Sequence, residues 1–134
     1  MSSDARVGIV LVSHSAALAE GAAELAAQIS GGTVAIIPAG GTDDGRLGTS
    51  AAKVRRAVKL ADGGAGVLIL PDLGSAVLTV RALAGEAGDL PAHVELADAP
   101  FVEGAVAATV AAAGGEDIKA VLAAAEEARH ARKL

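Results

Sequence analysis

The stretch VGIVLVSHSAALAEGAAELAAQISGG, residues 7–32, decides the fold class of this chain. It opens with an unbroken apolar run from Val7 to Val12, which is typical of a strand buried on both faces of a parallel sheet. Ser15 can then cap a helix predicted over residues 16–29. The helical period places four apolar residues on one face of this helix: Leu18, Ala22, Leu25 and Ile29. A buried strand followed at once by a helix predicts the first half of a βαβ unit.

The same alternation continues along the rest of the chain. Short apolar runs predict further strands at residues 33–37, 66–70 and 93–97. Helical patterns predict further helices from Thr49 or Ser50 to about 62, and over 75–87, 102–113 and 116–132. We therefore expect an α/β, doubly wound, mainly parallel sheet in the order 2-1-3-4, with helices on both faces and one domain over residues 1–134.

Composition excludes several functional classes. The chain has 134 residues, 52% of them hydrophobic, a net charge of -5, one Phe and no Cys. Nucleic-acid binding usually needs a basic face and stacking aromatics, so it is not expected. The absence of Cys rules out disulfides and thiolate chemistry. The apolar runs are strand-sized, so neither a membrane span nor a signal peptide is expected, and a cytoplasmic location is the prediction.

Two polar loops are predicted to meet at one point of the sheet. With strand order 2-1-3-4, the strand order reverses between strands 1 and 3, and ligands bind at the carboxyl ends of strands there. The loop after strand 1 holds His14 and Ser15, and the loop after strand 3 holds Asp72, Gly74 and Ser75. Each loop opens a helix whose free N–H groups favour an anion. A nucleophilic His, an Asp that sets its tautomer and two helix N-termini indicate a phosphoryl site.

Simpler interpretations of these residues stay open. Asp72 could cap the third helix and Ser15 the first, without any chemistry. His93, at a strand start, and His130, in a last helical turn, are expected to be structural. Asp43 and Asp44 have the pattern of turn formers, because no third oxygen ligand follows at a suitable spacing, and no metal site is predicted. The basic residues between Lys53 and Lys59 are expected to form a solvated face.

Four separated motifs resemble one known family. They are IVLVSHSAALAEGAAELA, the GTS at residues 48–50, LPDLGSA and DAPFVEGAVAATVAAAGG. Together they are similar to the phosphotransfer subunit of the phosphoenolpyruvate-dependent dihydroxyacetone kinase, a relative of the mannose-class enzyme IIA domains. The resemblance covers about residues 7–118. It implies a cytoplasmic homodimer that relays a phosphoryl group from the phosphocarrier protein HPr to ADP on the nucleotide-binding kinase subunit. The regenerated ATP then serves the dihydroxyacetone-binding subunit, which makes the chain one subunit of a phosphotransferase.

The resemblance also implies roles for single residues. His14 matches the phosphoryl acceptor, and Asp72 matches the carboxylate that pairs with it. Backbone N–H groups and hydroxyls at Ser15, Gly74 and Ser75 are the nearest candidates to bind phosphoryl oxygens, and Thr49 is a weaker one that could equally be an N-cap. No cofactor is expected on this chain itself, because ADP, ATP and magnesium belong to the partner subunit and the intermediate is phosphohistidine.

Two alternatives remain at this stage. A mannose-class sugar-transport enzyme IIA would share the fold and His14 but would donate to a transporter IIB protein. That branch typically carries Gly-Gly-Ser-Pro after the third strand, where this chain has DLGSAVL. A regulatory module that only binds a phosphorylated partner would not need the His-Asp pair.

Overall fold

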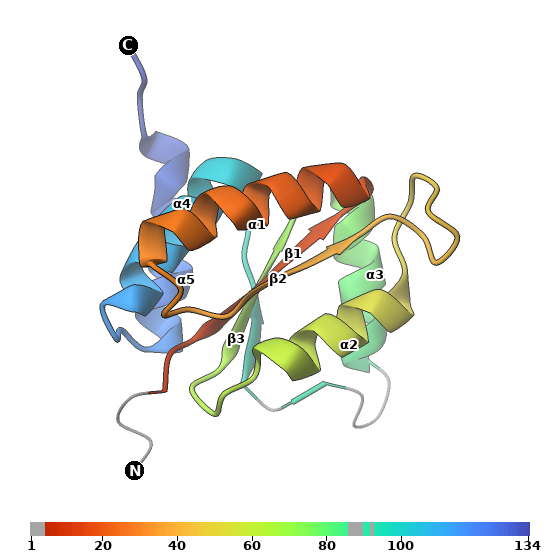
Figure 1. Ribbon diagram of the computed structural model, residues 1–134, viewed down its shortest axis with the longest axis horizontal. Helices are drawn as coiled ribbons and strands as arrows, with labels where there is room; N and C mark the ends of the chain where they lie inside the picture. Colours follow the sequence, from red (N-terminus) through yellow and green to blue (C-terminus); the bar gives the residue numbers. More distant parts are fainter. Residues whose placement is uncertain (1–4, 86–89, 92) are drawn as a thin grey trace.

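A computed structural model describes residues 5–85, 90–91 and 93–134 (Figure 1). The strands are β1 (Gly8–Ser13), β2 (Ile36–Gly40), β3 (Val67–Pro71) and β4 (Val94–Leu96). The helices are α1 (Ala16–Ser30), α2 (Ala51–Ala61), α3 (Gly74–Gly85), α4 (Phe101–Ala113) and α5 (Ile118–Glu127), followed by the short 3-10 helix η1 (Ala128–His130). Among the described residues, no helix combines the length and apolar character that crossing a membrane requires.

The sheet has the predicted topology. Its four strands lie in the order β2-β1-β3-β4 and all of the pairings are parallel. In this register Val10 of β1 lies between Ile37 of β2 and Ile69 of β3. The carboxyl ends of β1 and β3 therefore lie side by side, which is the geometry that a ligand crevice at the switch point needs.

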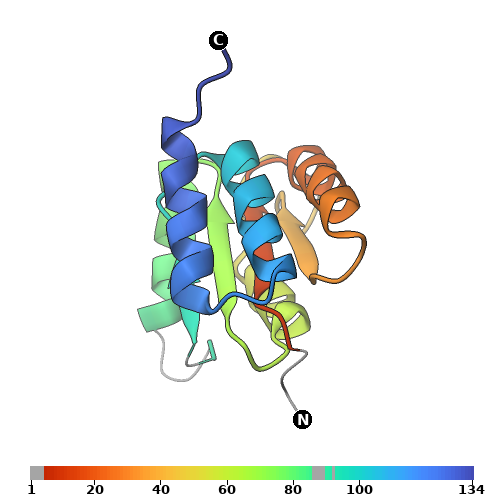
Figure 2. The same ribbon diagram turned by 90° about the vertical axis from the view of Figure 1, so that its left-hand side faces the viewer.

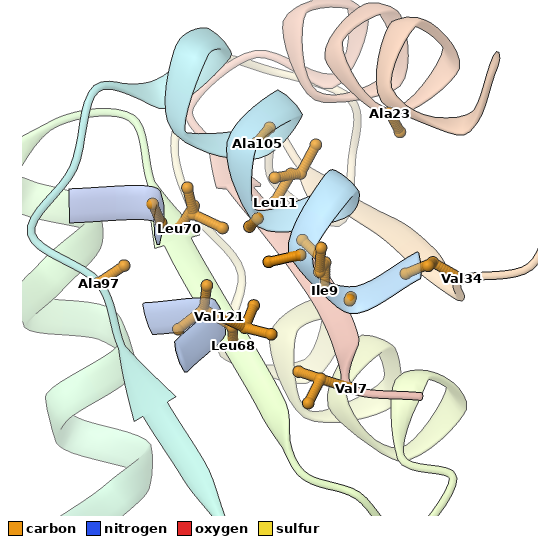
Figure 3. Close-up of a cluster of buried hydrophobic side chains, with 14 of the residues drawn as sticks. Val7, Ile9, Leu11, Ala23, Val34, Leu68, Leu70, Ala97, Ala105 and Val121 are labelled. Carbon is orange, nitrogen blue, oxygen red and sulfur yellow. The ribbon is translucent and has the colours of Figure 1, made fainter. Parts of the chain in front are cut away.

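Helices cover both faces of the sheet, as the doubly wound fold requires. One apolar core joins the sheet to α1, α4 and α5 and includes Ile9, Leu11, Leu68 and Val121 (Figure 3). The opposite core joins it to α2 and α3 through Val10, Ile69 and their neighbours. Figure 2 shows α4 and α5 side by side over the first of these faces. Because helices cover both faces, successive side chains of a strand are buried on opposite sides of the sheet. This burial accounts for the continuous apolar runs in the sequence.

The core-facing side of α1 consists of alanines. Ala19, Ala22, Ala23 and Ala26 are its buried residues. The predicted row on this helix does share a face, but only Ala22 of that row is buried, and Leu18, Leu25 and Ile29 are exposed. Alanine on both α1 and α4 allows the two backbones to pack closely, so the larger aliphatic side chains lie outside the contact.

The boundaries of β2 differ from the prediction by three residues at each end. The sequence predicts a strand over residues 33–37 and a loop from Pro38, whereas β2 runs from Ile36 to Gly40 and includes the proline. Pro38 cannot donate to a ladder, but β2 is an edge strand, and proline is tolerated where the missing N–H faces outward. The last helix begins later than predicted, because the Asp117 side chain caps it by accepting from the N–H of Ala120, and it ends earlier, at Glu127, where the 3-10 helix η1 follows.

Gly40 brings the end of β2 against the start of α1. A Cβ at this position would lie 2.5 Å from the carbonyl oxygen of Ser15 and 2.8 Å from the Cα of Ala16. Only glycine allows this approach without a shift of the backbone. The following residue, Gly41, donates its N–H to the Ser13 carbonyl at 3.1 Å. Both contacts fix the loop that carries residues 13–15.

Candidate functional site

Backbone hydrogen bonds join the end of β1 and its loop to the loops after β2 and β3 at the switch point. The N–H of Asp72 donates to the carbonyl of Val12 at 2.9 Å, and the N–H of Gly48 donates to the carbonyl of His14 at 2.9 Å. His14 therefore lies among three segments that are far apart in the sequence. The structure brings His14 and Asp72 together, as the sequence predicts.

The His14 ring has a different partner at each nitrogen. Its Nδ1 lies 3.0 Å from Asp72 Oδ1, and its Nε2 lies 2.5 Å from the hydroxyl oxygen of Ser75. A carboxylate only accepts hydrogen bonds, so the neutral ring carries its proton on Nδ1 and leaves a lone pair on Nε2. The His14 side chain is 24% exposed and that of Asp72 is 8% exposed. The arrangement places the Nε2 lone pair at the carboxyl ends of the central strands β1 and β3, where it could serve as a nucleophile.

Asp72 accepts three hydrogen bonds, all from the neighbouring residues Ser13 and His14. Besides the ring, its Oδ2 accepts from the Ser13 hydroxyl at 2.9 Å and from the His14 N–H at 3.0 Å. Burial alone would raise the pKa of Asp72, but the hydrogen bonds from the His14 backbone, the His14 ring and Ser13 together lower it. The carboxylate is thus ionised at neutral pH. These three bonds make Asp72 a partner of His14.

The other predicted site residues lie around this pair. Ser15 caps α1, because its hydroxyl accepts from the N–H of Leu18 at 3.2 Å. Gly74 and Ser75 form the first turn of α3 and are exposed. Because α1 and α3 both begin beside His14, their free N–H groups favour an anion there. Thr49 is engaged elsewhere: its hydroxyl lies 2.6 Å from that of Thr79, while Ser50 caps α2.

One residue of the site is not among those that the sequence predicts. Ser13, the last residue of β1, is fully buried, and its hydroxyl donates to Asp72. The sequence does hold one signal for this role of Ser13. A polar residue at the end of a buried strand needs a hydrogen-bond partner inside the protein. That partner is 59 residues away along the chain, which local pattern does not reveal.

A shallow recess adjoins the site. It has a volume of about 360 Å³ and lies between the β3–α3 turn and the β4–α4 connection, with Leu73, Gly74 and Arg81 in its lining. Within the part of the chain that the structure describes, no group of three or more His, Cys, Asp or Glu side chains could hold a metal ion. The groups that the structure places around His14 are the Asp72 carboxylate, the Ser13 and Ser75 hydroxyls and the N-termini of α1 and α3.

We expect Ser75→Ala to slow phosphoryl transfer through His14 about tenfold, the value of one ordinary hydrogen bond. The hydroxyl that holds Nε2 is the nearest side-chain donor for a phosphoryl oxygen once the ring has reacted. Single-turnover kinetics of phosphoryl acceptance measure this rate, and an unchanged melting temperature is the control because Ser75 is exposed. If Ser75 merely obstructs Nε2, the variant will react faster than the parent.

A doubly wound sheet with a polarised histidine at its switch point is the architecture to which one known protein family corresponds. The family model EIIA-man, described as "PTS system fructose IIA component", matches residues 8–122. This chain belongs to the EIIA-man family.

Similar curated proteins are phosphoryl donor subunits. The subunit named DhaM of the PEP-dependent dihydroxyacetone kinase of Providencia stuartii is 41% identical over 131 residues, which is 95% of this chain. The chain spans only 28% of the length of that relative, and the same share of an Escherichia coli DhaM that is 42% identical. The DhaM of dihydroxyacetone kinase 2 from Listeria innocua is 41% identical over 105 residues, covering 78% of this chain and 84% of the relative.

A solved structure has the same fold. The crystal structure of a protein of unknown function, EF1359, superposes with a TM-score of 0.78 and 38% sequence identity. The match covers 90% of this chain and 93% of that protein.

Proposed function

We propose that this chain is the phosphoryl donor subunit of a phosphoenolpyruvate-dependent dihydroxyacetone kinase and acts in the cytoplasm. His14 accepts a phosphoryl group from the phosphocarrier protein HPr. It then passes the group to ADP on the nucleotide-binding kinase subunit, so that ATP is regenerated for the dihydroxyacetone-binding subunit. The observation that carries the proposal is the pairing of His14 Nδ1 with Asp72, which leaves the lone pair on Nε2, where the Ser75 hydroxyl contacts it. The names of the similar proteins support the choice of acceptor.

The acceptance step follows from the protonation of the ring. The Nε2 lone pair attacks phosphorus, a new N–P bond forms, and the bond between phosphorus and the donor nitrogen of HPr breaks with its electron pair. The His14 ring keeps its Nδ1 proton and gains positive character, which the ionised Asp72 stabilises. The Ser75 hydroxyl and the N-terminal amides of α3 then face the phosphoryl oxygens.

Delivery reverses the same step. An oxygen of the terminal phosphate of ADP attacks phosphorus, the bond to Nε2 breaks, and its electron pair returns to the ring. ADP, ATP and magnesium stay on the partner subunit in this proposal. No Lys or Arg lies in residues 13–15 or 72–75, so no cationic side chain of these loops holds the phosphoryl group back.

We expect a charge at the crevice rim to impair both steps. Leu73 is 61% exposed and belongs to the turn that carries Asp72. Leu73→Glu should slow acceptance from HPr and delivery to ADP together, because both partners must reach the same face and a transient interface tolerates an unpaired charge poorly. Leu60→Glu is the matched control, since Leu60 is also exposed but lies near the end of α2 that is remote from the crevice. Equal rates for the two variants would contradict this docking face.

We further propose that the chain is a homodimer, with its contact on the exposed row Leu18, Leu25 and Ile29 of α1. A two-fold interface needs a surface that complements itself, and an aliphatic row without charges meets this condition. Leu25, which is 50% exposed, lies in the middle of the row.

Leu25→Glu should convert the dimer to a monomer, because two-fold pairing places both introduced charges in one apolar contact. Sedimentation equilibrium measures the change, with Leu60→Glu again as the control. A parent chain that is already monomeric, or a Leu25→Glu variant that remains dimeric, would contradict this assignment.

The alternative is a sugar-transport enzyme IIA that donates to a IIB protein, which the description of the matching family favours. The deciding experiment offers the phosphorylated chain to both acceptors, the ADP-loaded kinase subunit and a mannose-class IIB protein. Loss of phosphoryl from the chain with matching formation of ATP supports the kinase role. Discharge to the IIB protein alone would assign the chain to sugar transport.

A further inference from the structure

Ser13 is a buried hydroxyl with two partners at the centre of the site. It is the last residue of β1 and is 0% exposed. Its Oγ accepts from the N–H of Ser15 at 3.0 Å and donates to Asp72 Oδ2 at 2.9 Å. A serine hydroxyl carries one proton, and here that proton is directed at the carboxylate. Ser13 thereby connects the first residues of the His14 loop to Asp72.

The position of the Asp72 carboxylate depends on this contact. Oδ2 receives the Ser13 hydroxyl and the His14 N–H, and Oδ1 is left to the His14 ring. Two donors on one oxygen oppose rotation of the carboxylate, so Oδ1 stays aligned with Nδ1. The His14 N–H alone would hold Oδ2 at a single point.

We propose that Ser13 is a positioning residue for His14: it fixes the Asp72 carboxylate and, through it, the ring tautomer that presents the Nε2 lone pair. The inference rests on the proposed role of His14 as the nucleophile. Removal of the hydroxyl loosens Oδ1 from Nδ1, and the ring then also populates the tautomer protonated at Nε2. That tautomer has no lone pair on Nε2 for phosphorus.

The test compares two variants, Ser13→Ala and Ser30→Ala. Both remove a serine hydroxyl that accepts a hydrogen bond from the backbone N–H two residues further on. Ser30 also accepts from an N–H two residues further on, that of Gly32, but it ends α1 away from Asp72. Ser13→Thr restores a hydroxyl at the site. Two quantities are measured: the ¹⁵N shifts of the His14 ring in the unphosphorylated chain, which report the tautomer, and the rate of phosphoryl acceptance from HPr.

We expect Ser13→Ala to show both tautomers and to accept phosphoryl about tenfold more slowly, in keeping with one hydrogen bond to a charged group. Ser30→Ala should match the parent in both quantities, and Ser13→Thr, where it folds, should recover the parental tautomer. Parental ¹⁵N shifts and rate in Ser13→Ala would overturn the inference. If the parent chain accepts no phosphoryl group, the proposed function fails, while the ¹⁵N shifts still decide the role of Ser13.

Discussion

His14→Ala should abolish phosphoryl acceptance, because Ala offers no lone pair to phosphorus and no other histidine lies at the site. The chain is incubated with phosphoenolpyruvate, enzyme I and HPr, and acid-labile phosphoryl incorporation is measured. His130→Ala is the matched control: it removes an imidazole from η1 and should incorporate as the parent does. Incorporation into His14→Ala at the parental level would require another acceptor and would contradict the assignment.

Asp72→Asn should slow transfer by about two to four orders of magnitude, the upper value being that of the same substitution in a catalytic triad. The three groups that face Asp72 are all donors, namely the Ser13 hydroxyl, the His14 N–H and the protonated Nδ1. An amide presents one oxygen and one NH₂ group, so it favours the tautomer with Nδ1 as acceptor and Nε2 protonated. It also cannot balance the positive charge of the phosphorylated ring.

Single-turnover kinetics measure this loss, and Asp62→Asn is the control. Asp62 is an exposed carboxylate that accepts from the N–H of Gly64 beyond the end of α2. If Asp72→Asn transfers the phosphoryl group at the parental rate, Asp72 has only a structural role.

The same variant tests the lowered pKa of Asp72. A carboxyl group whose pKa is lower in the folded chain stabilises the fold at pH values above its unfolded pKa of about 3.9. This stabilisation is lost as the pH falls through the lower folded pKa. The melting temperatures of the parent and Asp72→Asn should therefore differ most near neutral pH and converge in strong acid. A difference that persists unchanged to the lowest pH at which both fold would contradict the shift.

The strand order and the meeting of His14 with Asp72 follow from local pattern together with the rules of parallel sheets. Apolar runs such as Val67–Leu70 indicate strands buried on both faces, and right-handed crossovers restrict their order. Once the order is 2-1-3-4, the loops after the first and third strands must be neighbours. The site is therefore predictable from its position in the fold more than from any one motif.

The observed structure differs from the sequence prediction where tertiary packing overrides the local preference of a residue. Pro38 breaks a strand in general, but an edge strand accepts it. Leu18, Leu25 and Ile29 have the pattern of a core face, yet close packing of α1 favours its alanines. Ser13 ends an apolar run, and its role depends on a carboxylate that only the folded chain brings near.

In the proposed mechanism, Asp72 holds Nδ1 of His14 so that Nε2 carries the phosphoryl group. The most direct test is ¹⁵N and ³¹P NMR of the chain labelled with ¹⁵N-histidine and phosphorylated through HPr. We expect one phosphohistidine, with ³¹P coupling at Nε2 of His14 and a proton on Nδ1. Coupling at Nδ1, or a phosphoryl group on any other residue, would contradict the account.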